Sequence, residues 1–389
     1  MKIISSIKNY VKKNRILLNL YENIFQRPII NYYKSSHRKK VLFVYSTYHF
    51  KKKNYTAHSN YSESLIIAKL FNELGYRIDI INNNRFYKNI DFKSYDIIFG
   101  EGISMYEAIK SNTSAKIIYY ATTSHPFQCT KASLNRLIDF YKRTNFLAYN
   151  SLRLQDERFG IAASTADYVI AIGNENTKKT FIDNGVTNIQ LINPTFYGGN
   201  TPPKIEKRSD AKRNLLYFAS YGLLHKGLDL VVDAMKDLKD FNLYVCGHID
   251  REQEFINMLN IPKNVSLIGF IDIKSIKFKD LAQKCGFVIM PSASEGTATS
   301  IITAMGLGAM IPIVTKECGV DIEDFGILIK DLTVEAVKES ILKILELDDK
   351  EYENRCKKAQ LNAYEKYTID KYEKQMRIYL TNLCVREQE

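Results

Sequence analysis

The segment that follows the apolar run FVIMPS (287–292) combines one carboxylate with small and hydroxyl-bearing residues. Its members are Glu295, Gly296, Thr297, Ala298, Thr299 and Ser300, and an apolar helix pattern then continues to about residue 307. Free amides and the dipole at the start of a helix favour phosphate, and Gly296 would let a ligand approach the backbone closely. Glu295 carries the wrong charge for phosphate but accepts hydrogen bonds from hydroxyls. The segment therefore predicts a site for a ligand with both groups, such as a nucleotide sugar.

A simpler interpretation of the same segment stays open from the sequence. Thr297 or Thr299 would cap the helix, and Glu295 would be solvated.

A second candidate residue follows another apolar run, NLLYFAS (214–220). Lys226 lies in YGLLHKGLDL, just before a helix pattern and next to Gly227. A lysine is a compact cation that suits phosphate oxygens, although a single loop lysine is more often simply exposed. Ligands of open α/β sheets bind beyond the carboxyl ends of the strands. A cation at one strand end and a carboxylate with free amides at another therefore favour one shared site.

The elements that would position these residues alternate between short apolar runs and helix patterns. Most of the runs are apolar throughout, which is typical of parallel strands covered on both faces. The expected strands are 41–45, 77–81, 96–100, 116–121, 168–173, 189–193, 214–220, 242–247, 265–269, 287–292, 311–315 and 326–330. Helix spacing between them, as in SESLIIAKLFNELG with Gly75 as a C-cap, predicts an α/β protein with two doubly wound, Rossmann-like domains facing across a cleft.

The composition of the chain suggests where the domains begin and end. A Gly-, Pro- and charge-rich stretch without periodicity separates the two halves and is typical of a linker. The expected organisation is an N-terminal extension (1–40), a first domain (41–196), a linker (197–213), a second domain (214–366) and a C-terminal helix that crosses back over the first domain (367–389).

The net charge of +12 is concentrated at the N-terminus, where residues 1–40 hold ten basic residues against Glu22. Apolar and aromatic residues interleave with these charges in IKNYVKKNRILLNLYENIF. This pattern is typical of a helical, amphipathic segment on an anionic membrane surface, or of a solvated helix packed on the protein. With no recognisable nucleic-acid-binding module elsewhere, we expect no nucleic acid partner.

Several classes of protein and site are not indicated. No apolar run approaches the length of a membrane span, and the N-terminus lacks the pattern of a signal peptide. The six cysteines form no C-x-x-C pair, so neither a disulfide scaffold nor a zinc site is expected, and a cytoplasmic location fits. No Asp-x-Asp triplet occurs, so no motif for a metal-bound diphosphate is present.

The motifs HKGLDLVVDAM, NLYVCG, VSLIGF, MPSASEG and AMGLGAMIPIV together resemble the donor domain of family 4 (group 1) glycosyltransferases of the GT-B fold, over roughly residues 212–365. The resemblance implies that Lys226 neutralises the donor diphosphate and that Glu295 holds hydroxyls of the transferred sugar. It also implies that the backbone at Gly296, Thr297 and Ala298 meets the sugar and phosphate. In the first domain, YYATTSHPF places His125 after a strand, where the family often has a histidine facing the cleft.

The chain departs from the family pattern at three places. The family pairs its first Glu with a second one eight positions on, which usually grips the donor ribose, and Thr303 stands there. The family also has an Arg five residues before the phosphate Lys, and that position is Tyr221. A Gly-rich loop that precedes a Glu in the first domain is replaced by NYSE, which ends at Glu63.

The expected activity is transfer of a sugar from a nucleotide-diphosphate sugar to a glycan or lipid-linked acceptor, without metal or other cofactor. The resemblance implies retention of configuration and a role in bacterial cell-surface polysaccharide synthesis. The basic extension (1–40) would bring the enzyme to the inner face of the cytoplasmic membrane. Two alternatives remain: a nucleotide-sugar 2-epimerase on the same fold, or an inactive nucleotide-sugar-binding subunit, which the changes at Thr303 and Tyr221 motivate.

Overall fold

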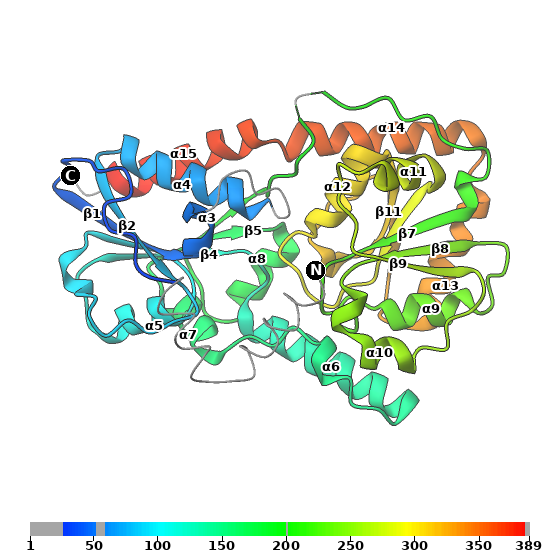
Figure 1. Cartoon of the computed structure of the whole chain (residues 1–389), viewed down its shortest axis with the longest axis horizontal. Helices are drawn as coiled ribbons and strands as arrows, with labels where there is room; N and C mark the ends of the chain where they lie inside the picture. The colour runs from blue at the N-terminus through cyan, green and yellow to red at the C-terminus, as the bar shows by residue number, and fades with distance from the viewer. Residues whose placement is uncertain (1–25, 52–58, 200, 386–389) are drawn as a thin grey trace.

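The computed structural model describes residues 26–51, 59–199 and 201–385, which form two α/β domains side by side (Figure 1). The sheet of the first domain has the strand order β2-β1-β3-β4-β5-β6, and all of its pairings are parallel. Its strands are β1 (Lys39–Tyr45), β2 (Tyr76–Asn82), β3 (Ile97–Gly100), β4 (Lys116–Ala121), β5 (Tyr168–Ile172) and β6 (Ile189–Ile192).

The sheet of the second domain has the order β12-β11-β10-β7-β8-β9 and is also parallel throughout. Its strands are β7 (Asn214–Phe218), β8 (Asn242–Cys246), β9 (Val265–Gly269), β10 (Phe287–Met290), β11 (Ile311–Thr315) and β12 (Ile327–Ile329). The twelve expected strands and the doubly wound fold are therefore confirmed.

Burial on both faces explains why these runs become parallel strands. In β1 the side chains of Val41 and Phe43 enter the core on one side of the sheet, and those of Leu42 and Val44 enter the core on the other. Successive residues of a strand point to opposite faces, so a strand covered on both sides must be apolar at every position.

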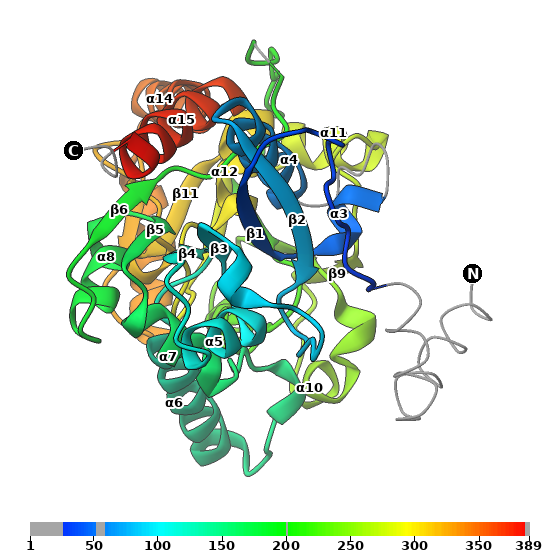
Figure 2. The ribbon, with the colours of Figure 1, turned by 90° about the vertical axis from the view of Figure 1, so that its left-hand side faces the viewer.

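Helices cover both faces of each sheet (Figures 1 and 2). Those of the first domain are α3 (Thr47–Lys51), α4 (Asn60–Glu73), α5 (Ile103–Lys110), α6 (Pro126–Thr144), α7 (Glu157–Thr165) and α8 (Glu175–Ile182). Those of the second domain are α9 (Leu228–Met235), α10 (Gln253–Met258), α11 (Ile276–Lys284), α12 (Thr299–Gly308), α13 (Val334–Leu342) and α14 (Asp349–Lys366), and the last helix, α15 (Ile369–Val385), follows them in the chain. Gly75, predicted as the C-cap of α4, has φ of +87° and donates its amide to Asn72 O.

The chain passes between the domains at the segment after β6 and again between α14 and α15. Helix α14 packs on α12, whereas α15 packs on α4 and β6 of the first domain (Figure 1). Tyr372 of α15 shares a 2.8 Å hydrogen bond with Tyr120 of β4, and Lys116 Nζ donates to Leu383 O at 2.6 Å. The last helix thus fastens the second domain to the first.

Most of the expected N-terminal extension, residues 1–25, lies outside the described residues. Residues 26–38, its second part, contain no helix, and the part around Ile29 and Tyr32 pairs with the edge strand β2. Ile29 forms an antiparallel bridge with Ile80, and Tyr32 N donates to Ile78 O at 2.9 Å. The expected helical character is therefore wrong for residues 26–38, because the edge of the sheet offers this segment backbone partners. No helix among the described residues is long and apolar enough to cross a membrane.

Helix α6 belongs to the first domain by sequence but packs partly against the second. Phe140 lies within the core of the second domain. Arg136, also buried, donates to both carboxylate oxygens of Asp229 on α9 at 2.7 Å. Arg143 contacts the same carboxylate and donates to Asp233 at 2.8 Å.

We expect Asp229→Ala to lower the free energy of unfolding by about 3–5 kcal/mol, because it leaves the buried Arg136 guanidinium without its counter-ion. Asp233→Ala removes a partly exposed partner of Arg143 on the same helix and serves as the control, with a cost of under about 1 kcal/mol. Chemical denaturation monitored by circular dichroism measures both. Equal stability of the two variants would show that the α6–α9 ion pair does not hold the domains.

Candidate active site

A cavity of about 1050 Å³ lies between the domains at the carboxyl ends of both sheets. The strand order reverses between β1 and β3 in the first sheet and between β7 and β10 in the second. Ligands of doubly wound sheets bind at such reversals. Lys226 follows β7 and Glu295 follows β10, and both line the cavity. The fold therefore brings the two predicted residues together.

Glu295 is buried and its carboxylate contacts two cations. Oε1 accepts hydrogen bonds from Lys226 Nζ and from Ser292 Oγ, the latter at 2.9 Å. Oε2 accepts a hydrogen bond from Arg153 Nη1 at 2.6 Å. Burial by itself would raise the pKa of Glu295, but Lys226 and Arg153 outweigh burial and hold the pKa well below its usual range. The carboxylate is therefore ionised at all physiological pH values.

The loop of Lys226 is fixed by its own backbone and by a buried acid, Glu252. Glu252 accepts hydrogen bonds from the amides of Gly222 and Leu223, at 2.6 and 2.8 Å. Gly227 has φ of +70°, and a Cβ there would lie 2.4 Å from Pro291 O. Only glycine fits this left-handed, crowded position, so the loop can approach the β10 strand end and place the Lys226 side chain at Glu295.

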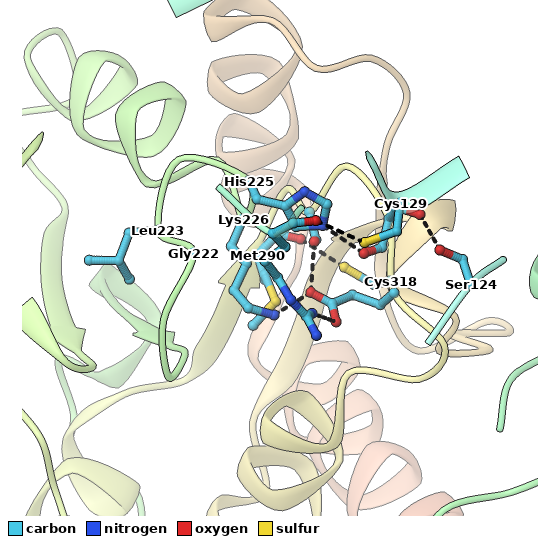
Figure 3. Close-up of polar contacts among 12 residues, drawn as sticks. Ser124, Cys129, Gly222, Leu223, His225, Lys226, Met290 and Cys318 are labelled. Atoms are coloured by element: carbon cyan, nitrogen blue, oxygen red, sulfur yellow. Dashed lines mark hydrogen bonds and ion pairs between the residues drawn. The ribbon is translucent and has the colours of Figure 1, made fainter. Parts of the chain in front are cut away.

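His225, the neighbour of Lys226, fastens this loop to two other segments (Figure 3). Its Nε2 lies 2.7 Å from Ser294 O and its Nδ1 lies 2.8 Å from Ser133 Oγ of α6. Burial lowers the pKa of His225 to about 4, so the ring is neutral at neutral pH. A neutral ring with its proton on Nε2 satisfies both contacts. The sequence motif that contains His225 indicates no role for this histidine. The structure shows that His225 positions the Lys226 loop against Ser294 and against α6.

The start of α12 differs from the simple capping interpretation of this segment. The N-cap position is Ala298, which has no polar side chain, and Glu295 is buried. The simple capping interpretation with a solvated Glu295 is therefore wrong. Thr297 and Ala298 line the cavity, as do the first residues of α12, Thr299 and Ser300.

Gly296 is crowded, but by the first domain. A Cβ at this residue would lie 2.5 Å from Ile172 O, and Gly296 O accepts a hydrogen bond from Thr177 Oγ1 at 2.9 Å. The close approach that we expected from a ligand is thus made by the end of β5. Glycine at this position lets the two domains meet beside the cavity.

Arg153, the second cation on Glu295, was not predicted. It lies between α6 and α7 in the first domain and lines the cavity. Its guanidinium carbon is 5.9 Å from the centre of the Tyr221 ring. No local pattern separates Arg153 from other arginines such as Arg158, so the sequence carries no signal for it.

Thr303 lies one turn into α12 and lines the cavity. Its hydroxyl donates to Thr299 O at 2.8 Å, which leaves the oxygen able to accept one hydrogen bond from a ligand. The position that carries the second Glu of the family motif therefore faces the predicted ligand, but without a charge.

His125 does not face the cleft as expected. It is fully buried at the N-cap of α6, where its Nδ1 accepts from Phe127 N at 3.3 Å and its Nε2 lies 3.1 Å from Ser164 Oγ. Burial lowers the pKa of His125 to about 4. The ring packs between Phe127 and Phe181, so this histidine stabilises the first domain and has no path to a ligand in the cavity.

The first-domain wall of the cavity carries two buried carboxyl groups. Glu101 directly follows β3 and accepts from Asn83 Nδ2 at 3.0 Å, and Glu63 of α4 accepts from Thr195 N at 2.7 Å. Burial raises the pKa of both to about 7, so each can hold a proton near neutral pH. The rule that functional residues follow the strands, which predicted Glu295, predicts Glu101 as well. Among the residues that the structure describes, no group of three or more His, Cys, Asp or Glu could hold a metal ion.

Residues 203–363, which contain most of the second domain, match the family model described as glycosyl transferases group 1. A search of curated protein sequences gives no match. Among solved structures, HepE of Anabaena, determined in complex with UDP-glucose, has a TM-score of 0.57 at 15% identity over 88% of this chain and 99% of its own. Sucrose-phosphate synthase of Thermosynechococcus elongatus has a TM-score of 0.58 at 13% identity, over 89% and 99%.

A third similar structure is WaaG, a glycosyltransferase involved in lipopolysaccharide biosynthesis, with a TM-score of 0.51 at 13% identity over 89% of this chain and 99% of its own. These likenesses cover both domains and agree with the fold expected from the sequence motifs. The family model identifies the domain that carries Lys226 and Glu295. The second domain therefore resembles the glycosyl transferases group 1 family, and the chain as a whole has the two-domain GT-B fold.

Proposed function

We propose that this enzyme transfers a sugar from a nucleotide-diphosphate sugar to a hydroxyl of a glycan or lipid-linked acceptor. The observation that carries the proposal is the meeting of Lys226 and Glu295 at one wall of the cavity, beside the start of α12. A cation and helix amides suit the diphosphate, and a permanently ionised carboxylate suits the sugar hydroxyls. HepE, of similar fold, was solved with UDP-glucose, which supports a donor of this class.

Departure of the diphosphate is the step that needs electrostatic help, because negative charge develops on it as the glycosidic bond breaks. Lys226 would stabilise that charge from one side and the backbone amides of the first residues of α12, Thr299 and Ser300, from the other. These groups are fixed by the Gly227 turn and by Glu252, so they need little rearrangement during the reaction. We propose that transfer proceeds without a metal ion because the chain supplies these cationic and dipolar groups itself.

The resemblance to family 4 enzymes supports retention of configuration, in which the acceptor hydroxyl attacks from the side of the leaving group. The acceptor would then lie on the first-domain wall, where Asn83 and Glu101 present polar atoms to the cavity. These side chains suit the hydroxyl groups of a glycan. The Tyr45 ring at the end of β1 would pack on the apolar face of a sugar.

The basic N-terminus supports a proposed setting at the inner face of the cytoplasmic membrane. Residues 1–25 hold five basic residues against Glu22, interleaved with apolar ones. WaaG, which shares the fold, is involved in lipopolysaccharide biosynthesis, and this supports a cell-surface polysaccharide pathway for the present enzyme.

Turnover of a panel of nucleotide sugars, followed as chromatographic release of the nucleoside diphosphate, tests the donor site. We expect Lys226→Ala to lower kcat/KM by about 10²–10³-fold, because it removes a preorganised cation from the leaving group. Glu295→Ala should also lose turnover, since no other carboxylate replaces its contact with the sugar. Lys236→Ala, at an exposed position just after α9, is the control and should keep full activity. Wild-type turnover retained in both site variants, or epimerisation of the donor without acceptor, would contradict the proposal.

Thr303 can be tested by restoring the carboxylate of the family motif. The preference of each protein for UDP over its 2′,3′-dideoxy analogue is the ratio of the two affinities. This preference should be at least tenfold greater in Thr303→Glu than in the wild type, because hydrogen bonds to a charged group contribute about 1.5–3 kcal/mol. Calorimetric titration of both ligands gives this ratio. Thr303→Val keeps the size without the hydroxyl and should discriminate less than the wild type. If Thr303→Glu and Thr303→Val discriminate equally, the ribose does not lie beside α12.

Removal of residues 1–25 tests the membrane proposal while leaving the segment paired with β2 in place. We expect the truncated chain to bind vesicles of mixed anionic and zwitterionic lipid at least tenfold more weakly than the full chain in cosedimentation, because it loses the basic, apolar segment. A full-length chain with five exposed lysines of the second domain changed to Gln removes similar charge elsewhere and should bind normally; these are Lys236, Lys239, Lys277, Lys279 and Lys357. Equal binding of the truncated and full chains would refute the proposal that residues 1–25 bind the membrane.

A further inference from the structure

The contact between Arg153 and Glu295 joins the two domains at the centre of the donor site. Arg153 comes from the first domain, whereas Glu295 and Lys226 come from the second. All three line the same cavity, and the two cations contact opposite oxygens of one carboxylate. Together they carry a net positive charge in a largely buried place.

The backbone of Arg153 is fixed, so the guanidinium is aimed at this place by the fold. Arg153 N donates a hydrogen bond to Ser133 Oγ of α6 at 3.1 Å. Arg153 O accepts from Cys129 Sγ at 3.4 Å. The side chain is only 18% exposed.

The residue at the position where the family motif has an arginine contacts the side chain of Arg153. Tyr221 stands there, and its ring lies 5.9 Å from the guanidinium, within the range of a cation–π contact. A Cβ at the next residue, Gly222, would lie 2.6 Å from Arg153 Cγ, so the absence of a side chain at Gly222 makes room for the arginine stem. Tyr221 and Gly222 of the second domain therefore pack around the side chain of a cation that comes from the first domain.

We propose that Arg153 is the second diphosphate-binding cation of this enzyme, in place of the arginine that the family motif carries at position 221, and that Glu295 occupies both cations only until the donor binds. This inference rests on the proposed function. When the diphosphate enters, its oxygens replace the carboxylate at Lys226 and Arg153, and Glu295 turns to the sugar hydroxyls. A guanidinium can bind phosphate oxygens through two parallel hydrogen bonds, which suits this exchange.

The exchange also couples donor binding to the arrangement of the domains. Without donor, the Arg153–Glu295 contact bridges the domains, and with donor the phosphates would form the bridge. A buried cation that lost one anion without gaining another would be strongly destabilised, so the carboxylate leaves only as the diphosphate arrives.

Calorimetric titration of UDP, UMP and uridine into matched variants tests the role of Arg153. We expect Arg153→Gln to weaken UDP binding by at least tenfold and to leave uridine binding unchanged. Arg158→Gln, which removes a surface arginine paired with Asp156 in the same domain, is the control and should bind UDP like the wild type. UDP binding by Arg153→Gln within twofold of the wild type would overturn the inference.

Two further variants distinguish phosphate binding by Arg153 from a purely structural role, a latch that only holds the two domains together. The double variant Arg153→Gln/Tyr221→Arg restores the arginine of the family motif and should regain most of the lost UDP affinity, which a latch role does not predict. Glu295→Gln removes the competing carboxylate and should bind UDP several-fold more tightly than the wild type. Absence of both effects would mean that Arg153 only fastens the domains, even if Arg153→Gln proved unstable.

The same titrations distinguish this inference from the proposed function. If the wild type binds UDP and Lys226→Ala loses that binding while Arg153→Gln keeps it, the donor site stands and Arg153 is not part of it. If neither the wild type nor any variant binds UDP, UMP or the nucleotide sugars, the proposed donor class itself is wrong.

Discussion

The structure depends on one buried carboxylate held between two cations. Glu295 accepts hydrogen bonds from Lys226 in its own domain and from Arg153 in the other, so neither cation lies in the low-dielectric cleft without a counter-ion. An unpaired charge in such a place would be costly, and three groups from distant parts of the sequence therefore have to arrive together. Glu295 therefore links the two domains at the cavity.

The supporting contacts all reduce the freedom of these three groups. Gly227 allows a left-handed turn against the β10 strand end, and Glu252 binds the amides at the start of the same loop. His225 joins that loop to the segment before Glu295 and to α6. A site fixed in this way can stabilise charge that develops on a leaving group without first having to reorganise, as the proposed sugar transfer requires.

The opposite wall of the cavity has a different electrostatic character. Glu101 and Glu63 are buried there, and burial raises the pKa of each to about 7. The wall of the second domain thus holds a permanently ionised acid between cations, while the wall of the first domain holds acids that can carry a proton. This difference suits a charged donor on one side and a neutral, hydroxylated acceptor on the other.

The amino-acid sequence by itself determined the twelve strands, the doubly wound fold and the meeting of Lys226 with Glu295. Strands buried on both faces must be apolar throughout, and residues that follow parallel strands share one edge of the sheet, so local pattern carried this information. Only the tertiary structure decided the roles of His125 and Arg153. Whether a histidine after a strand turns toward the cleft or into the core depends on the packing of Phe127 and Phe181 around it. Arg153 reaches Glu295 because α6 docks on the second domain, and a contact between residues 142 positions apart leaves no trace in the spacing of either.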